Sequence, residues 1–155
     1  MTKTNAMRQL DRAGISYEVQ CYAYEESDLS GVHAAEALHM PPERIFKTLV
    51  TRGEKRGIQV FCIPVAANLD LKKAARISGD KKIEMIPVKE LLGLTGYLRG
   101  GCSPIGMKKQ YPTFIDRSAL DFDRIGVSAG KRGQQLLLHP EDLIRFVGIT
   151  PADLT

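Results

Sequence analysis

The feature that most constrains the fold is a pair of apolar segments separated by a short polar turn. Residues 45–51 (IFKTLVT) and 58–63 (IQVFCI) are rich in β-branched and aromatic side chains, and the sequence GEKRG at residues 53–57 separates them. This pattern is typical of two antiparallel strands joined by a tight connection. We therefore expect a β-hairpin here, and the remaining segments must be fitted around it.

The segments around the hairpin mix helical and extended patterns without regular alternation, which argues against a doubly wound parallel sheet. The 155 residues suit one domain with a core of its own. We expect a single compact domain over residues 1–155, of the mixed α/β (α+β) class, with helices surrounding a curled, largely antiparallel sheet. The glycine-rich stretch 93–106 is expected to be mostly loop. Helices are expected at 5–13, 30–38, 70–77, from 87, and at 140–147, and strands at 15–22, 83–85, 113–115, 125–127 and 134–138.

Composition disfavours several classes of protein. Cys21, Cys62 and Cys102 are scattered and form no CxxC pair, and the three histidines lack metal-ligand spacing. We therefore expect no disulfide framework, no metal and no cofactor. No apolar run is long enough to cross a bilayer, and the N-terminal residues lack the apolar core of a signal peptide. A cytoplasmic protein that does not insert in a membrane is the simplest interpretation.

The formal net charge of +4 is compatible with a polyanionic partner. Four cationic pairs, at residues 72–73, 81–82, 108–109 and 131–132, lie near expected loops or helix ends. They form either a rim that contacts phosphates or a scattered solubilising surface.

Lys47 is the most informative single residue. It lies in an apolar strand and shares a face with Ile45 and Leu49, because side chains alternate along a strand. Lysine is almost never fully buried without a partner. It is either an edge lysine with a buried stem or a cation fixed on a rigid strand. In the second case it would hold a phosphate or carboxylate, or polarise a carbonyl.

Two glycine-rich segments are further candidates. In residues 98–106 (LRGGCSPIG), adjacent glycines permit unusual backbone angles, and their N–H groups could converge on an oxyanion; a structural turn is the alternative. Residues 127–133 (VSAGKRG) lack the GxxxxGK[ST] spacing of a nucleotide-hydrolysing loop, so a turn between two strands is the simpler interpretation. A nucleophilic Cys102 would need a base or a strongly electropositive site, and no histidine is near it in sequence.

Five segments taken together resemble a known family. They are FKTLV (46–50), NLDLKK (68–73), KKIEM (81–85), TGYLRGGCSPIG (95–106) and SAGKRG (128–133). Their order and spacing are similar to those of the free-standing Cys-tRNA(Pro) deacylases of the YbaK/EbsC group. These enzymes are relatives of the editing domain inserted in bacterial prolyl-tRNA synthetases. The resemblance covers nearly the whole chain.

The resemblance implies an aminoacyl-tRNA deacylase that removes cysteine from Cys-tRNA(Pro), and by extension from Cys-tRNA(Cys). The thiol of the substrate would attack its own ester carbonyl, releasing tRNA and a cyclic thiolactone. Such an enzyme needs orientation and oxyanion stabilisation rather than a catalytic triad. The implied partners are tRNA(Pro), tRNA(Cys) and prolyl-tRNA synthetase.

The resemblance also implies a set of site residues. Lys47 is the central functional residue, which would position the terminal adenosine or the ester. Main-chain N–H groups of Gly100 and Gly101 would stabilise the oxyanion. One substrate-binding residue is a tyrosine, for which Tyr22 is an alternative to Tyr24. The substrate-binding residues implied are Tyr24, Ser103, Pro104, Ser128, Gly130 and Gln135.

Two departures from the family pattern leave alternatives open. Cys102 stands where the family often has an apolar residue, so its thiol inherits no role. Gln135 stands near a position where some members carry aspartate, and an amide keeps hydrogen bonding but loses the charge that would face the substrate ammonium. The alternatives are a deacylase for alanine or another small amino acid, a non-catalytic module that binds tRNA or a synthetase, and a hydrolase that uses Cys102.

Overall fold

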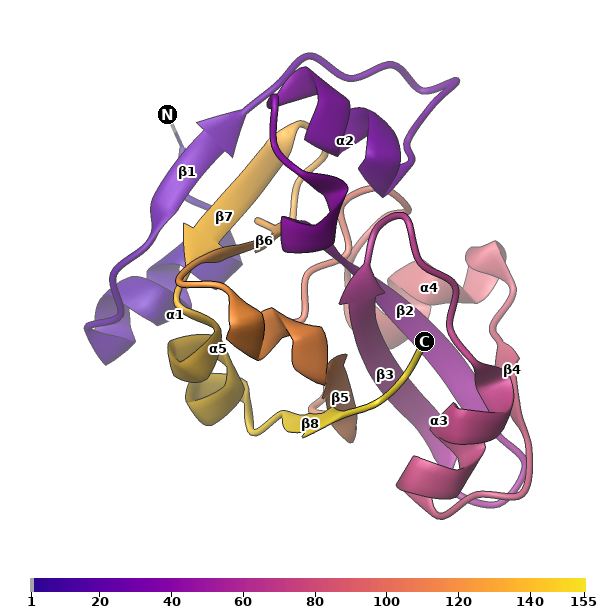
Figure 1. Cartoon of the computed structure of the whole chain (residues 1–155). Coiled ribbons are helices and arrows are strands. Elements are labelled where there is room, and N and C mark those ends of the chain that lie inside the picture. The colour runs from indigo at the N-terminus through magenta and orange to yellow at the C-terminus, as the bar shows by residue number, and fades with distance from the viewer. Residues whose placement is uncertain (1) are drawn as a thin grey trace.

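The expected hairpin is the centre of a five-stranded sheet in the computed structural model, which describes residues 2–155 and so leaves Met1 of the expected domain outside (Figure 1). Strands β2 (Phe46–Gly53) and β3 (Gly57–Pro64) pair antiparallel along their whole length. The sheet order is β4-β2-β3-β5-β8, and the β3–β5 and β5–β8 pairs are parallel. The other strands of this sheet are β4 (Ile83–Met85), β5 (Thr113–Asp116) and β8 (Thr150–Ala152).

A second, three-stranded sheet holds β1 (Glu18–Cys21), β7 (Gln134–Leu138) and β6 (Ile125–Ser128), all antiparallel. The largely antiparallel character is confirmed, but the strands of the described chain form two sheets rather than one. The sheets meet at an isolated parallel bridge between Ile45 and Gly126. A methyl group on Gly126 would lie 2.5 Å from Cδ1 of Ile45, so glycine permits this contact. Because β2 and β6 form no ladder beyond this bridge, no continuous curled sheet forms.

Several helices begin at capping side chains. The Oγ of Ser30 accepts a hydrogen bond from the His33 N–H, and the Asp70 carboxylate accepts from two N–H groups of the next helix. The first part of the glycine-rich stretch is helical, because the helix after Pro87 continues to Thr95. The helices are α1 (Asn5–Ala13), α2 (Gly31–Ala37), α3 (Leu71–Ser78), α4 (Val88–Thr95) and α5 (Pro140–Val147), with 3-10 turns η1 (Pro42–Arg44) and η2 (Arg117–Asp121).

The two faces of the β2–β3 hairpin pack against different layers. On one face Phe61 stacks on Phe114 at a ring-centroid distance of 5.2 Å, and this cluster packs under α3. On the other face Val50 and Val60 pack against Tyr97 and Cys102. Side-chain alternation therefore places Lys47 on the α3 face of β2 and its neighbour Thr48 on the face of the glycine-rich loop.

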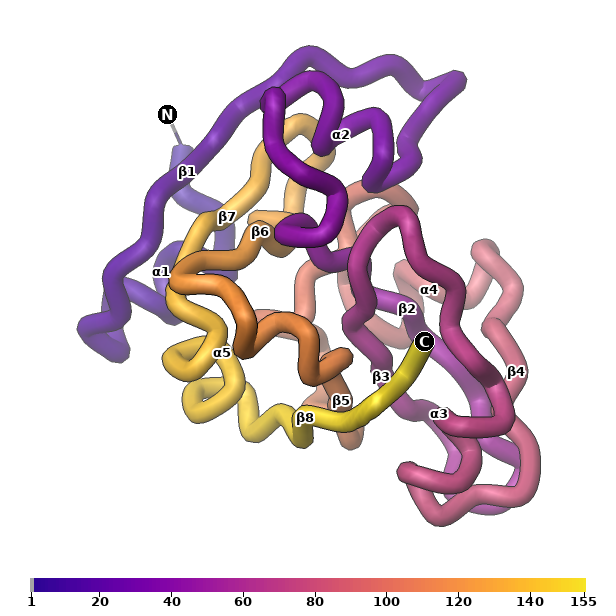
Figure 2. Tube along the Cα trace, viewed as in Figure 1, coloured from indigo at the N-terminus to yellow at the C-terminus, as the bar shows by residue number. Residues whose placement is uncertain are grey.

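Segments that are distant in sequence meet at one end of the molecule. The chain that leaves β1 runs beside the turn between β6 and β7, as the tube in Figure 2 shows, and the Tyr22 N–H donates to the Gly133 carbonyl at 2.9 Å. Within residues 2–155, none of the helices combines the length and apolar character that a membrane span requires.

Candidate active site

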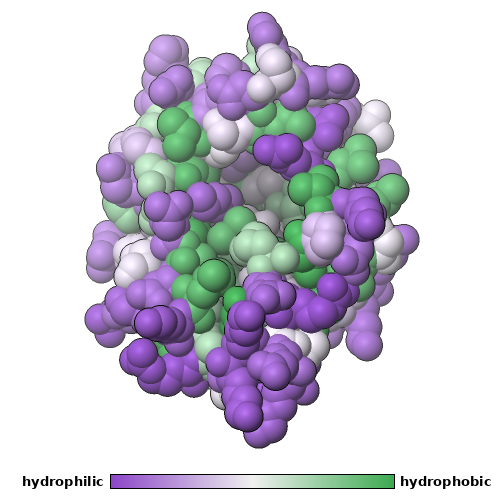
Figure 3. Space-filling view, turned by 90° about the vertical axis from the view of Figure 1, so that its right-hand side faces the viewer, coloured by the Kyte–Doolittle hydropathy of each residue, from purple (hydrophilic) through white to green (hydrophobic). Residues whose placement is uncertain are grey.

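A cavity of about 350 Å³ lies between α2, the edge of β2, α4 and the glycine-rich loop. Strand β4 pairs with β2 only at residues 51–53, so residues 46–49 leave one strand edge uncovered by the sheet. All of residues 45–50 line the cavity at this edge. Figure 3 shows a hollow in the molecular surface, with hydrophobic side chains at its border and hydrophilic ones around them. The size and mixed lining are typical of a small-molecule site.

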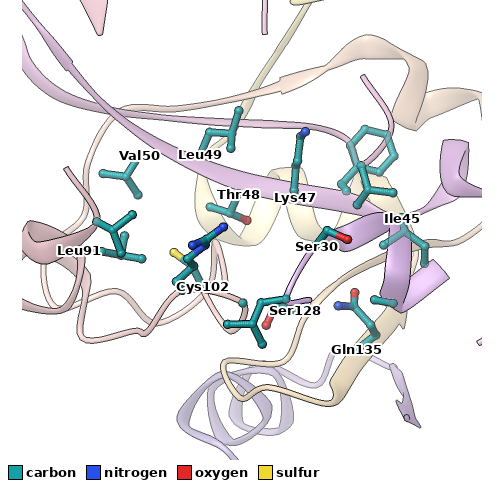
Figure 4. A pocket seen from close by; sticks show the side chains of 18 of the residues that line it. Ser30, Ile45, Lys47, Thr48, Leu49, Val50, Leu91, Cys102, Ser128 and Gln135 are labelled. Carbon is teal, nitrogen blue, oxygen red and sulfur yellow. The ribbon is translucent and has the colours of Figure 1, made fainter. Parts of the chain in front are cut away.

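Lys47 lines this cavity and is half-buried. Figure 4 shows its side chain leaving β2 on the side opposite to Thr48. Burial holds the pKa of its amine below the ordinary value of 10.5. Within the described chain no carboxylate lies within 4.0 Å of that amine, and no acidic residue or histidine lines the cavity. Lys47 is thus an edge lysine whose amine is free to meet an anion or a carbonyl.

Gln135 supplies the cavity with a buried acceptor. Its side chain is 6% exposed, and its Oε1 has no hydrogen-bond partner among the described residues. Leaving a buried acceptor unpaired costs about 1–3 kcal/mol. Gln135 lies opposite Ser128 in the β6–β7 ladder, and both line the cavity (Figure 4). The Oε1 atom is therefore positioned for a donor that a ligand would bring.

The glycine-rich loop contributes fewer free donors than expected. Leu98 to Gly101 form a turn in which the Gly101 N–H donates to the Leu98 carbonyl at 2.9 Å, and Gly100 at the third position has φ 85°. A positive φ there is typical of a type II turn and favours glycine. The expectation that Gly101 offers its N–H to an oxyanion is therefore wrong for this conformation. Gly100 lines the cavity, and its N–H has no acceptor within residues 2–155.

Three other predicted residues shape the site from behind rather than line it. Ser103 and Pro104 are buried, and the Ser103 Oγ accepts from the Ile105 N–H at 3.2 Å. Gly130, with φ 95°, packs so closely on the Tyr97 ring that a methyl group would lie 2.8 Å from Cε1. These residues fix the course of two loops that border the cavity.

Of the two alternative tyrosines, Tyr22 lines the cavity and Tyr24 does not. The Tyr22 N–H extends the β1–β7 ladder by one bond to Gly133, and this pairing sets the position of its ring. The Tyr24 side chain lies outside against Gly133 and is 45% exposed. The placement of Tyr24 in the cavity is corrected in favour of Tyr22.

Cys102 lines the cavity but is unsuited to nucleophilic attack. Burial raises the pKa of its thiol to about 12, and a hydrogen bond with Thr95 only partly opposes this effect. The thiol is therefore protonated near neutral pH, whereas a cysteine nucleophile acts as thiolate. Cys62 is fully buried and has its pKa raised to about 12 for the same reason.

Several lining residues were not predicted as site residues. In the sequence, Ser30 stands out only as the first residue of the expected helix 30–38, and Arg99 only as part of the segment 98–106. The apolar wall includes Ala34, Val65 and Leu91, which come from three separate segments. Their convergence depends on contacts between α2, β3 and α4, for which the local sequence holds no signal.

Comparison with known proteins identifies the family. The sequence model of the aminoacyl-tRNA editing domain matches residues 29–146. The chain belongs to the aminoacyl-tRNA editing domain family. The matched span of this editing domain includes four predicted residues that line the cavity, Lys47, Gly100, Ser128 and Gln135.

Individual relatives are similar over most of their length. The chain is 48% identical over 153 residues to the Enterococcus faecalis protein named "Putative Cys-tRNA(Pro)/Cys-tRNA(Cys) deacylase EbsC", covering 99% of this chain and 93% of the relative. It is 33% identical over 125 residues to an uncharacterised Bacillus subtilis protein, YwhH, covering 79% of this chain and 78% of the relative. A solved structure titled as a "putative trans-editing enzyme for prolyl tRNA synthetase" superposes with a TM-score of 0.84 at 26% identity, covering 99% of each chain. The two-sheet arrangement is therefore the fold of this editing family.

Proposed function

We propose that this editing domain removes cysteine from Cys-tRNA(Pro), and also from Cys-tRNA(Cys), by breaking the ester between the amino acid and the terminal adenosine. The relative that is 48% identical over nearly the whole chain carries that activity in its name. The similar solved structure is named for trans-editing with prolyl tRNA synthetase. Both relationships support a substrate that is an aminoacyl-tRNA.

The composition of the cavity carries the proposal. Its lining holds no carboxylate and no histidine among the described residues, and its one thiol is protonated. A nucleophilic serine or cysteine requires an adjacent base, and within residues 2–155 no histidine ring or lysine amine is hydrogen-bonded to a hydroxyl of the lining. The Ser30 hydroxyl donates to the Asp28 carboxylate at 2.7 Å and accepts from the main-chain N–H of His33, so it serves as a helix cap. It does hold the Lys47 amine and the Gln135 Oε1 without protein partners. Such a cavity suits a substrate that brings its own nucleophile.

The cysteine substrate supplies that nucleophile through its thiol. The sulfur attacks the ester carbonyl carbon, a carbon–sulfur bond forms, and the bond from that carbon to the ribose oxygen breaks. The proton of the thiol ends on the leaving ribose hydroxyl, and the products are free tRNA and a cyclic thiolactone. No water is consumed. The reaction is an intramolecular ester exchange, so holding the thiol near the carbonyl supplies most of the acceleration.

The cavity residues take roles that follow from their chemistry. The Lys47 ammonium stabilises the developing oxyanion or binds the phosphate of the terminal nucleotide, and the free N–H of Gly100 offers a second hydrogen-bond donor to the substrate from the other face of β2. The Gln135 Oε1 accepts a hydrogen bond from the α-ammonium of the substrate. Ser128, whose Oγ accepts from the Gly130 N–H at 3.2 Å, keeps its hydroxyl proton for the ligand.

We further propose that residues 1–155 act as one editing domain in the cytoplasm. Its substrate there would be mischarged tRNA that prolyl-tRNA synthetase has released and that this editing domain then binds as a separate protein. The basis is the similarity to the free-standing relative, which covers 99% of this chain.

The test is a deacylation assay with Cys-tRNA(Pro), Cys-tRNA(Cys) and Ala-tRNA(Pro), using the wild type and Lys47→Ala. We expect rapid release of cysteine, a thiolactone that can be trapped with an added amine, and loss of activity in the variant. Equal rates on alanine and cysteine substrates would contradict thiol attack, because alanine has no thiol. Tight tRNA binding without any deacylation would show a binding module instead.

A further inference from the structure

Four side chains form a surface beside the cavity that the proposed chemistry does not use. We call this surface the outer platform and define it as Tyr24, Arg99, Lys131 and Arg132. Arg99 lines the cavity, and the Nε of Arg132 donates to the Arg99 carbonyl at 2.8 Å. The main chain of residues 131–132 packs on Gly101, where a methyl group would lie 3.1 Å from the Arg132 nitrogen. The outer platform is therefore continuous with the lining of the cavity.

Tyr24 gives the outer platform an open aromatic surface. A methyl group on Gly133 would lie 2.9 Å from Cδ1 of Tyr24, so the ring rests directly on the glycine. The residue is nevertheless 45% exposed, which leaves much of the ring open to solvent. Glycine at position 133 is what lets the ring lie against the turn that also carries the two cations.

The cations of the outer platform have no anionic partner within residues 2–155. Arg99, Lys131 and Arg132 each lack a carboxylate within 4.0 Å. In two other cationic pairs a lysine is neutralised, Lys73 by Asp153 at 3.0 Å and Lys82 by Glu84 at 3.0 Å. The positive charge beside the cavity is thus available to an external anion.

We propose that the outer platform binds the single-stranded nucleotides that precede the terminal adenosine of tRNA, with a base stacked on Tyr24 and phosphates held by the cations. An exposed aromatic ring among unpaired cations is the usual combination for single-stranded nucleic acid. The strand would continue from the outer platform past Arg99 into the cavity, where the aminoacyl ester lies. This inference rests on the proposed function, because it assigns the approach path of the same substrate.

The first measurement is direct binding of an uncharged oligoribonucleotide with the sequence of the tRNA 3′ end. Fluorescence anisotropy monitors this binding over a range of salt concentrations. We expect Tyr24→Ala to weaken binding by roughly 5- to 150-fold, the worth of one base–aromatic stack. Tyr24→Phe should bind nearly as the wild type does. Lys131→Ala should reduce the slope of log affinity against log salt by about 0.7, as expected for one lost phosphate contact on a single strand. Arg76→Ala, an exposed cation on α3, is the matched control and should change neither quantity.

The second measurement compares kcat/KM for Cys-tRNA(Pro) with that for 3′-cysteinyl-adenosine, which lacks the preceding nucleotides. In Tyr24→Ala and Lys131→Ala, the ratio of kcat/KM for Cys-tRNA(Pro) to kcat/KM for 3′-cysteinyl-adenosine should fall. In Arg76→Ala this ratio should stay the same as in the wild type. Oligoribonucleotide binding that is unaffected by the first two variants would overturn the inference. So would tighter binding of polyglutamate than of RNA, which would show an acidic protein partner. If binding depends on Tyr24 but the wild type deacylates no aminoacyl-tRNA, the outer platform stands and the proposed function fails.

Discussion

Lys47 lies directly opposite Ile63 in the antiparallel ladder between β2 and β3. A cationic side chain therefore shares one face of the sheet with a fully buried apolar one. An isolated charge is costly beside apolar surface, and the lowered pKa of Lys47 reflects that cost. A residue kept at a position unfavourable for stability is a good candidate for function.

Replacing Lys47 by methionine should therefore separate stability from activity. The unbranched apolar side chain fills similar space without a charge, so we expect a thermal unfolding temperature equal to or above that of the wild type. Deacylation of Cys-tRNA(Pro) should fall by about 100-fold or more, the usual effect of removing one oxyanion-stabilising group. Calorimetry and an initial-rate assay measure the two effects. A variant that unfolds earlier and keeps its activity would assign Lys47 to structure.

The lowered pKa of Lys47 also predicts a pH dependence. Between that pKa and 10.5 the unfolded chain holds the proton that the folded chain has lost, so this group makes stability rise with pH in that interval. Activity should change in the opposite sense, because the neutral amine no longer stabilises an oxyanion. In Lys47→Arg the cation persists at all accessible pH values. The ratio of wild-type to Lys47→Arg kcat/KM should therefore fall as pH rises toward 10.5, and a constant ratio would contradict a role for the charge.

Gln135 should control binding of the aminoacyl group. Gln135→Leu removes the unpaired buried acceptor, so the folded protein should be at least as stable to urea as the wild type. The substrate α-ammonium then loses its acceptor, and KM for Cys-tRNA(Pro) should rise by roughly 5- to 150-fold, corresponding to one unmade hydrogen bond. Gln135→Glu restores an acceptor and should recover most of the affinity. An unchanged KM in Gln135→Leu would show that the ammonium lies elsewhere.

The contrast between Tyr22 and Tyr24 shows how far the sequence alone could be interpreted. Features set by neighbouring residues were predictable: the β2–β3 hairpin from its two apolar runs, and the start of α3 from its Asp70 cap. The choice between two tyrosines depends on one hydrogen bond to Gly133, which is 111 residues away from Tyr22 along the chain. Likewise, residues 150–152 form strand β8 only because they pair with β5. Contacts between distant segments decide such cases, and no local pattern records them.

The three cysteines should differ sharply in reactivity. Cys21 is exposed, whereas burial raises the thiol pKa values of Cys62 and Cys102 to about 12. Alkylation proceeds through the thiolate, so iodoacetamide at pH 8 should label Cys21 alone in the folded protein. Mass spectrometry of peptides gives the label at each site, and labelling in guanidinium should reach all three. Rapid labelling of Cys102 in the folded protein, or loss of deacylation in Cys102→Ala, would support the hypothesis that Cys102 is a nucleophile.

Asp80 should stabilise the hairpin without affecting catalysis. Its carboxylate accepts hydrogen bonds from the N–H groups of Lys55 and Arg56 in the hairpin turn and of Lys81 and Lys82 beyond α3. Desolvation acts to raise the pKa of this carboxyl, but the four donors outweigh it and the pKa lies below 3.8. A depressed carboxyl pKa contributes stability that is present above the unfolded value and is lost as pH falls through the folded one.

Asp80→Asn should therefore lower the unfolding temperature at pH 7, because the neutral amide accepts less strongly and turns a donor toward backbone N–H groups. The difference from the wild type should shrink as the pH falls from 3.8 through the lower pKa of the folded carboxyl, because the wild-type carboxyl then also becomes neutral. Asp121→Asn is the matched control, since Asp121 is exposed and its carboxylate makes no hydrogen bond or ion pair within residues 2–155. Asp80 does not line the cavity, so kcat for deacylation at 20 °C should be retained in both variants. Equal unfolding temperatures for the two variants would mean that the four backbone hydrogen bonds do not hold the hairpin turn to the segment after α3.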